Sequence, residues 1–136
     1  MTGYTIGELA RATGVHLETI RYYQRVGLLP VPPRADGAAR RYGPEAVERL
    51  LLIRSARRLT FSLAEIAGLV AVAEDQKGCA DARAIAAGRL AAVEREVGEL
   101  QVIVRELGRL VRECDSAGGS SCPILRHLSR SETLKS

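Results

Sequence analysis

Aromatic side chains and long apolar runs are scarce in this sequence. Its 136 residues include no Trp, one Phe and four Tyr, and aromatic residues total 4%, so a core must be mostly aliphatic. No apolar run approaches the ~18 residues that span a membrane, and the chain does not open with a basic segment followed by a signal-type apolar core. We therefore expect a cytoplasmic protein that makes no membrane contact.

Catalytic groups are also few. The sequence has two His, and it lacks a paired-carboxylate or Ser/His/Asp arrangement, a Gly-rich phosphate loop and a Cys-x-x-Cys pair. We therefore predict that the protein is not an enzyme. Cysteine is limited to three residues, and an odd number in a chain without an export signal argues for free or metal-binding thiols rather than a disulfide scaffold.

Excess positive charge is confined to one half of the chain. Residues 1–60 contain ten Arg and no Lys against five acidic residues, whereas residues 61–136 contain ten basic and eleven acidic residues. The formal net charge of +4 thus combines a basic half with a nearly neutral half. This segregation is expected when one half faces a polyanion such as nucleic acid, although a solvated basic face has the same composition.

The first part of the chain has the pattern of a helix-turn-helix. Thr5 and Glu8 have the spacing of a capping box in front of an apolar stripe, and Gly14 is expected to end that helix. A second helix is expected to follow, with Val15, Leu17 and Ile20 on its apolar side and residues up to Tyr23 included. Two helices joined by a Gly-containing turn match a DNA-binding motif, but many helical hairpins share this pattern.

Residues 27–43 are rich in Gly and Pro, which excludes a helix there. We interpret the segment as a hairpin wing, with residues 28–29 and 40–42 as short strands and residues 36–37 near the turn. A basic wing after a helix-turn-helix would place Arg34, Arg40 and Arg41 near phosphates. The alternative is an irregular surface loop.

Two further helices are predicted after this wing. Pro44 suits a first helical position, and Ser62 with Glu65 has the spacing of a second capping box, which opens a helix over residues 63–72. The residues expected on the buried sides of the two helices are Val47, Leu50, Leu51, Ile53, Leu63, Ile66, Leu69 and Val70.

Residues 81–113 form the clearest predicted element, a long helix with one narrow apolar seam. Apolar residues recur at alternating steps of four and three, and no proline interrupts them. The helix could pack on its own domain, but the chain offers no partner of similar length, so we predict that it pairs with a second copy. The seam consists of Ala86, Leu90, Val93, Val97, Leu100, Val104, Leu107 and Val111.

The three cysteines flank this helix. Cys79 precedes it, Cys114 follows it, and Cys122 lies beyond a polar loop that lets its sulfur approach that of Cys114. A continuous helix would separate Cys79 from Cys114 by roughly 50 Å. An antiparallel dimer instead brings Cys79 of one subunit to the other two thiols of its partner, which gives two three-thiolate sites for a thiophilic ion. The alternative is three incidental thiols, and we interpret His127 as a surface residue rather than a ligand.

Several short motifs occur together along the chain: residues 5–10, 14–15, 18–25, 27–29, 37, 40–43, 57–59, 61–63 and 65–66. In this order they resemble the MerR family of transcription regulators, and the resemblance covers about residues 4–128. It implies a homodimer on a palindromic operator, within a promoter whose RNA polymerase elements lie too far apart. The apo dimer would repress, and metal binding would make the dimer distort the DNA and activate transcription. By this resemblance the DNA contacts are Thr19, Arg21, Tyr22 and Tyr23, with Arg34, Arg40, Arg41 and Arg54 at phosphates. The alternative for one of the two tyrosines is a place in the core, and their spacing does not decide which one.

The cysteine pattern resembles the mercury-responsive members of this family, so the resemblance implies that Cys79, Cys114 and Cys122 bind Hg(II). Copper sensors typically have serine at the position of Cys79, and zinc sensors have an extra cysteine beside Cys114. The loop between Cys114 and Cys122 is one residue shorter than in mercury regulators and nearer the copper-sensor length. Pb(II), Cd(II), Zn(II) or Cu(I) sensing, or a thiol-redox response of Cys114 and Cys122, are the alternatives.

The predicted fold is mainly α. We expect a winged helix-turn-helix DNA-binding domain over residues 1–73 and a linker with an antiparallel coiled-coil dimerisation helix over residues 74–113. A metal-binding loop and a short C-terminal helix would occupy residues 114–136.

Overall fold

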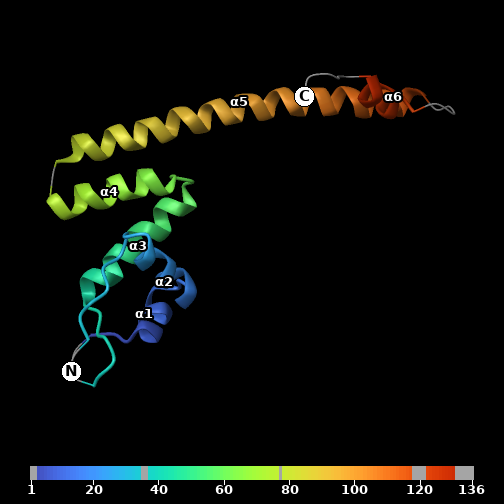
Figure 1. Cartoon of the computed structure of the whole chain (residues 1–136). Helices are drawn as coiled ribbons and strands as arrows, with labels where there is room; N and C mark the ends of the chain where they lie inside the picture. The colour runs from blue at the N-terminus through green and yellow to red at the C-terminus, as the bar shows by residue number, and fades with distance from the viewer. Residues whose placement is uncertain (1–2, 35–36, 77, 118–121, 131–136) are drawn as a thin grey trace. The chain divides into compact units, whose positions relative to one another are not determined.

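The computed structural model describes residues 3–34, 37–76, 78–117 and 122–130 (Figure 1). Within these residues the chain forms six helices and no extended strand. The helices are α1 (Ile6–Thr13), α2 (Leu17–Arg25), α3 (Pro44–Arg58), α4 (Leu63–Asp75), α5 (Cys79–Ala117) and α6 (Pro123–Arg130). The chain comprises two compact units, residues 1–89 and residues 90–136.

The predicted helix boundaries in the first unit follow from local hydrogen bonding. The backbone N–H of Thr5 donates to the Glu8 carboxylate at 2.9 Å, and the Glu8 N–H donates to the Thr5 hydroxyl at 3.2 Å. Ser62 and Glu65 form the equivalent capping box at the start of α4. Gly14 ends α1 with a φ of 72°, a left-handed conformation that glycine adopts without a steric penalty. These predictions are confirmed.

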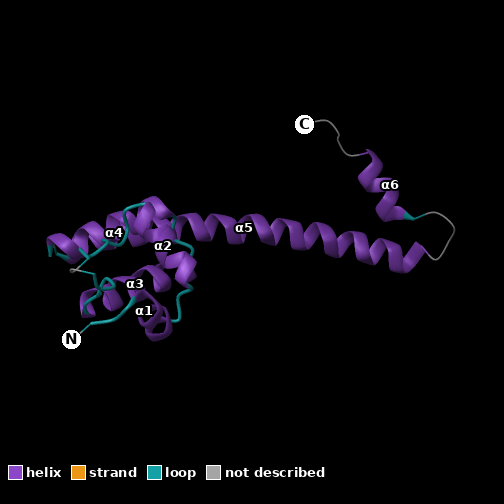
Figure 2. Cartoon of the chain, turned by 60° about the horizontal axis from the view of Figure 1, so that its bottom comes forward, coloured by secondary structure: helices purple, strands orange, loops and turns teal. Residues whose placement is uncertain are grey.

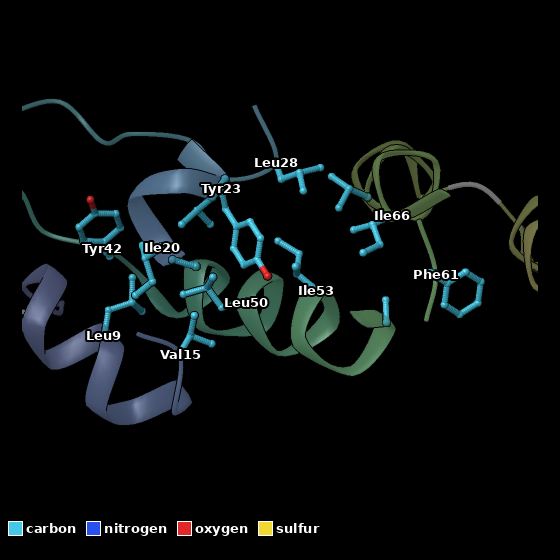
Figure 3. Packing of buried hydrophobic residues seen from close by; sticks show 14 residues of the cluster. Leu9, Val15, Ile20, Tyr23, Leu28, Tyr42, Leu50, Ile53, Phe61 and Ile66 are labelled. Carbon is cyan, nitrogen blue, oxygen red and sulfur yellow. The ribbon is translucent and has the colours of Figure 1, made fainter. Parts of the chain in front are cut away.

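Aliphatic side chains from α1 to α4 form one core. α1 packs against α2 and α3, and α3 packs against α4. Val47 of α3 is only partly buried, whereas Leu51 is 41% exposed, so its prediction as a buried residue is wrong. The buried side of α3 instead includes Ala46 and Ala56. Figure 3 shows much of this cluster, whose fully buried apolar members are Leu9, Ile20, Leu29, Leu50, Ile53 and Ile66.

The predicted pairing within the wing is wrong. Tyr42 forms an isolated antiparallel bridge with Tyr4, and each N–H donates to the other's carbonyl at 2.8 Å. Leu28 and Leu29 are buried core residues, and their N–H groups donate to the carbonyl of Tyr23 at the end of α2. Their apolar side chains and these backbone bonds keep them at α2. Asp36 of the expected turn lies outside the described residues.

The first turns of α5 belong to the N-terminal unit. Ile85 packs against the core, and a Cβ on Gly68 of α4 would lie 3.0 Å from its Cδ1, so glycine permits this close approach. Arg89 Nη2 lies 3.0 Å from the carboxylate of Glu65. Beyond these turns α5 continues as one unbroken helix to Ala117 (Figure 2). The boundaries predicted at residues 73 and 113 remain predictions.

In the part of the chain that the structure describes, most of the seam of α5 is uncovered. Six of its eight residues are about half exposed or more: Leu90, Val97, Leu100, Val104, Leu107 and Val111. Val102 and Ile103 add further exposed apolar surface beside it. Exposed apolar patches of this extent mark interaction surfaces. Among the described helices, none has the length and hydropathy to cross a membrane.

Candidate nucleic-acid interface and metal centre

Three of the predicted DNA contacts line one hollow in the N-terminal unit. Arg21 of α2 and Arg34 and Arg40 of the wing line a depression of about 240 Å³, together with Gln24 and Tyr42. The helix-turn-helix and the wing therefore present their guanidinium groups to the same space. Several guanidinium groups at one concave surface suit a phosphate backbone.

Hydrogen bonds fix the wing against α2. The Gln24 side-chain amide donates to the Tyr42 hydroxyl at 2.7 Å, and Arg40 Nε donates to the carbonyl of Pro32 at 3.0 Å. Gln24 was not a predicted site residue. Its sequence signal is only a polar residue near the end of an amphipathic helix, because its partner lies 18 positions away.

The other predicted DNA contacts lie outside the lining of this hollow. Arg41 lies 3.6 Å from the Glu8 carboxylate. Arg54 Nη1 donates to the carbonyl of Thr13 at 2.7 Å, so this residue fixes the end of α1 against α3. Thr19 is half-buried on α2. Their contacts with DNA remain predictions.

The two adjacent tyrosines of α2 have different environments. Tyr22 is 37% exposed, and the Arg25 guanidinium lies 5.7 Å from its ring centre. Tyr23 is 7% exposed, and Figure 3 shows its ring among core residues beside Leu50 and Ile53. Tyr23 is thus the tyrosine of the pair that belongs to the core, and its contact with DNA remains a prediction. Because neighbouring residues on a helix point about 100° apart, only one of the two rings can face the core.

The three cysteines occupy helix ends. Cys79 is the first residue of α5 and is exposed, and Cys114 lies in its last turn and is also exposed. Cys122 immediately precedes α6 and is half-buried. Among the described residues of the single chain, no three metal-ligating side chains form a cluster.

Cys114 and Cys122 are the two thiols that the fold brings together. The backbone N–H of Leu125, at the start of α6, lowers the pKa of Cys122 from its ordinary 9.0. Burial opposes this shift, while the Ile124 N–H, a hydrogen bond with the Cys114 thiol and the positive charge of Arg126 add to it. A thiol with a lowered pKa at a helix N-terminus is readily available as thiolate, the form that binds metals.

Comparison with known proteins places the chain in a family. The model of the MerR HTH family regulatory proteins matches residues 4–72, and a second model, described as MerR, DNA binding, matches residues 47–110. A mercuric resistance operon regulatory protein from Serratia marcescens is 42% identical over 125 residues, which cover 91% of this chain and 86% of that protein. The chain belongs to the MerR family. Family membership confirms the predicted DNA-binding function, and the relatives are transcriptional regulators rather than enzymes.

Two solved structures of MerR-family regulators resemble the whole chain. PbrR691 from Ralstonia metallidurans CH34, solved with Pb(II), has a TM-score of 0.80 and 35% identity, covering 92% of this chain and 98% of that one. MerR from Bacillus megaterium MB1, solved with Hg(II), has a TM-score of 0.73 and 32% identity, covering 93% and 100%. The predicted fold class and the predicted function, metal-responsive transcriptional regulation, are confirmed at this level.

Proposed function

We propose that this MerR-family protein senses Hg(II) through Cys79 of one subunit and Cys114 and Cys122 of its partner, and thereby controls a mercury resistance promoter. The observation that carries this proposal is the contact between Cys114 and Cys122. Two thiols of one chain already converge, and the third lies at the opposite end of α5. A homodimer with antiparallel α5 helices supplies the missing thiol twice.

The chemistry of the donor set fits Hg(II). Three sulfurs without a nitrogen or oxygen donor suit a soft ion, whereas Zn(II) normally takes four ligands. His127 pairs with Glu106 at 2.9 Å, which supports excluding it from the ligand set. When bound, the ion would supply a link between the two subunits. The relatives named for mercuric resistance and the structural neighbour with bound Hg(II) favour the same ion.

The exposed seam supports the homodimer. Its apolar side chains repeat along α5 with coiled-coil spacing, and burying them requires a second long helix. The guanidinium groups of Arg21, Arg34 and Arg40 would contact phosphates of a palindromic operator. We infer that the apo dimer represses and that the metal-bound dimer distorts the promoter DNA so that RNA polymerase can initiate.

A heterodimer experiment tests the cross-subunit site. One subunit carries Cys79→Ala, and the other carries Cys114→Ala and Cys122→Ala, each with a different affinity tag so that the heterodimer can be isolated. Each homodimer should lack a complete site, whereas the heterodimer should bind one Hg(II) with three sulfurs under thiol buffering. A heterodimer that binds no more tightly than either homodimer would contradict the proposal.

Promoter activation tests the identity of the ion. Transcription from the protein's own promoter is measured with Hg(II), Pb(II), Cd(II), Zn(II) and Cu(I) under reducing conditions. We expect activation at the lowest free concentration with Hg(II). A stronger response to Pb(II), which the similarity to PbrR691 favours as the second candidate, would reassign the effector. Activation by an oxidant without metal would instead indicate a thiol-redox sensor.

A further inference from the structure

A chain of charged side chains links α6 to the last turns of α5. His127 Nε2 of α6 lies 2.9 Å from the Glu106 carboxylate, within hydrogen-bonding distance for its N–H. Arg109 donates to that same carboxylate at 3.0 Å and to Glu113 at 2.9 Å. Both carboxylates raise the pKa of Arg109. Because Glu113 directly precedes Cys114, this chain of contacts runs from α6 to the predicted metal ligand on α5.

Apolar burial accompanies these polar contacts. Leu110 of α5 is 3% exposed, the only buried residue among those described between positions 90 and 130. A side chain on an isolated helix cannot reach such burial, so a neighbouring segment covers it. Pro123, Ile124 and His127 are the half-buried residues of α6, whereas Leu125 and Leu128 are 66% and 61% exposed. One side of α6 therefore faces α5.

We propose that Glu106 and His127 are positioning residues that hold α6 on α5 and thereby place Cys122 against Cys114. The carbonyl of Cys122 accepts the Arg126 N–H at 3.1 Å as the first bond of α6, so the orientation of α6 determines where this thiol lies. Cys114 lies in the last turn of α5, and Cys122 directly precedes α6. Contacts that hold α6 on α5 therefore also hold the Cys122 thiol near the end of α5. This inference deepens the proposed function but does not depend on the identity of the metal.

The effective concentration of Cys114 relative to Cys122 measures this placement without any metal. The full chain carries Cys79→Ser, which leaves two thiols, and is equilibrated in buffers of reduced and oxidised glutathione. Oxidised glutathione accepts the two electrons, both cysteine protons pass to the two glutathione thiols released, and one sulfur–sulfur bond forms in the chain. The oxidised fraction is quantified by acid quench, alkylation and mass spectrometry.

We expect His127→Leu and Glu106→Ala each to lower the effective concentration by about two- to fivefold, the range that a half-exposed pair supports. His127→Gln should restore most of it, because its amide N–H can reach the same carboxylate. Glu99→Ala is the matched control, since Glu99 is an exposed carboxylate on α5 that forms no ion pair with another described residue. It should leave the value unchanged.

Three outcomes would overturn the inference. These are an effective concentration in His127→Leu equal to that of the Cys79→Ser parent, a loss in His127→Gln as large as in His127→Leu, or an equal loss in Glu99→Ala. The double variant of Glu106 and His127 should lose no more than Glu106→Ala alone, because that change already breaks the contact with His127. If the expected losses occur but the wild type binds no Hg(II), the positioning role stands and the proposed function fails.

Discussion

The seam of α5 makes a quantitative prediction about dimer stability. Leu100, near the middle of the helix, is 59% exposed in the single chain, and pairing would remove that surface from water. Full burial of a leucine contributes about 1.5–3 kcal/mol, so this fraction contributes about 1–2 kcal/mol. A twofold dimer contains Leu100 twice, which raises the contribution to about 2–4 kcal/mol.

We therefore expect Leu100→Ala to raise the Kd of the apo dimer by about 10- to 500-fold, since each 1.4 kcal/mol is tenfold and alanine keeps one methyl group. Alanine is at least as good a helix former as leucine, so loss of helix propensity cannot produce this change. Sedimentation equilibrium over a concentration series, under reducing conditions and without DNA, measures the Kd. The control is Gln101→Ala, an exposed neighbour outside the seam.

Two results would refute this reasoning. The first is a Leu100→Ala dimer whose Kd equals that of the wild-type dimer, which would mean that Leu100 is not buried between subunits. The second is an equal weakening by Gln101→Ala, which would mean that the interface does not follow the seam.

Three further predictions concern the N-terminal unit. Tyr23→Ala should lower the free energy of unfolding by about 3–5 kcal/mol, whereas Tyr22→Ala should keep near wild-type stability and weaken DNA binding. Denaturant unfolding measures the stability of each variant, and fluorescence anisotropy with labelled DNA measures its binding. Equal destabilisation by the two changes would contradict the assignment of Tyr23, and not Tyr22, to the core. Arg34→Gln should reduce the slope of log K against log salt by about one, and an unchanged slope would exclude a phosphate contact. The Ser62 N–H holds the pKa of Glu65 below its ordinary 4.5, so the stabilisation is complete above pH 4.5 and is lost as the pH falls through the lower folded-state pKa. Glu65→Gln should therefore flatten the acid side of the stability profile, which unfolding titrations would reveal.

Features set by neighbouring residues could be predicted from the sequence. The capping boxes of Thr5 and Ser62, the end of α1 at Gly14 and the unbroken course of α5 depend on local hydrogen bonds and periodicity. The proximity of Cys114 and Cys122 also follows from their short separation in the sequence. In each of these features the contacting residues are close in the sequence, so local backbone geometry alone brings them together.

Features set by distant partners could not be predicted. The bridge between Tyr4 and Tyr42, the hydrogen bond from Gln24 and the assignment of Tyr23 to the core depend on how the helices pack. The same limit applies to His127, whose pairing with Glu106 requires α6 to turn back toward α5. Tyr, Gln and His also occur on protein surfaces that bind nothing, so the spacing of these residues in the sequence cannot identify the residues that they contact.

The location of Cys79 has a thermodynamic consequence. This residue belongs to the compact unit that carries the arginines predicted to contact DNA, whereas Cys114 and Cys122 belong to the other unit. A cross-subunit site would thus join the DNA-reading body of one subunit to the sensor end of its partner. Coupling free energies are reciprocal. If bound metal favours the distorted operator by a given factor, then a distorted operator must raise the metal affinity of the protein by the same factor. The promoter itself would then help to set the concentration at which the sensor responds.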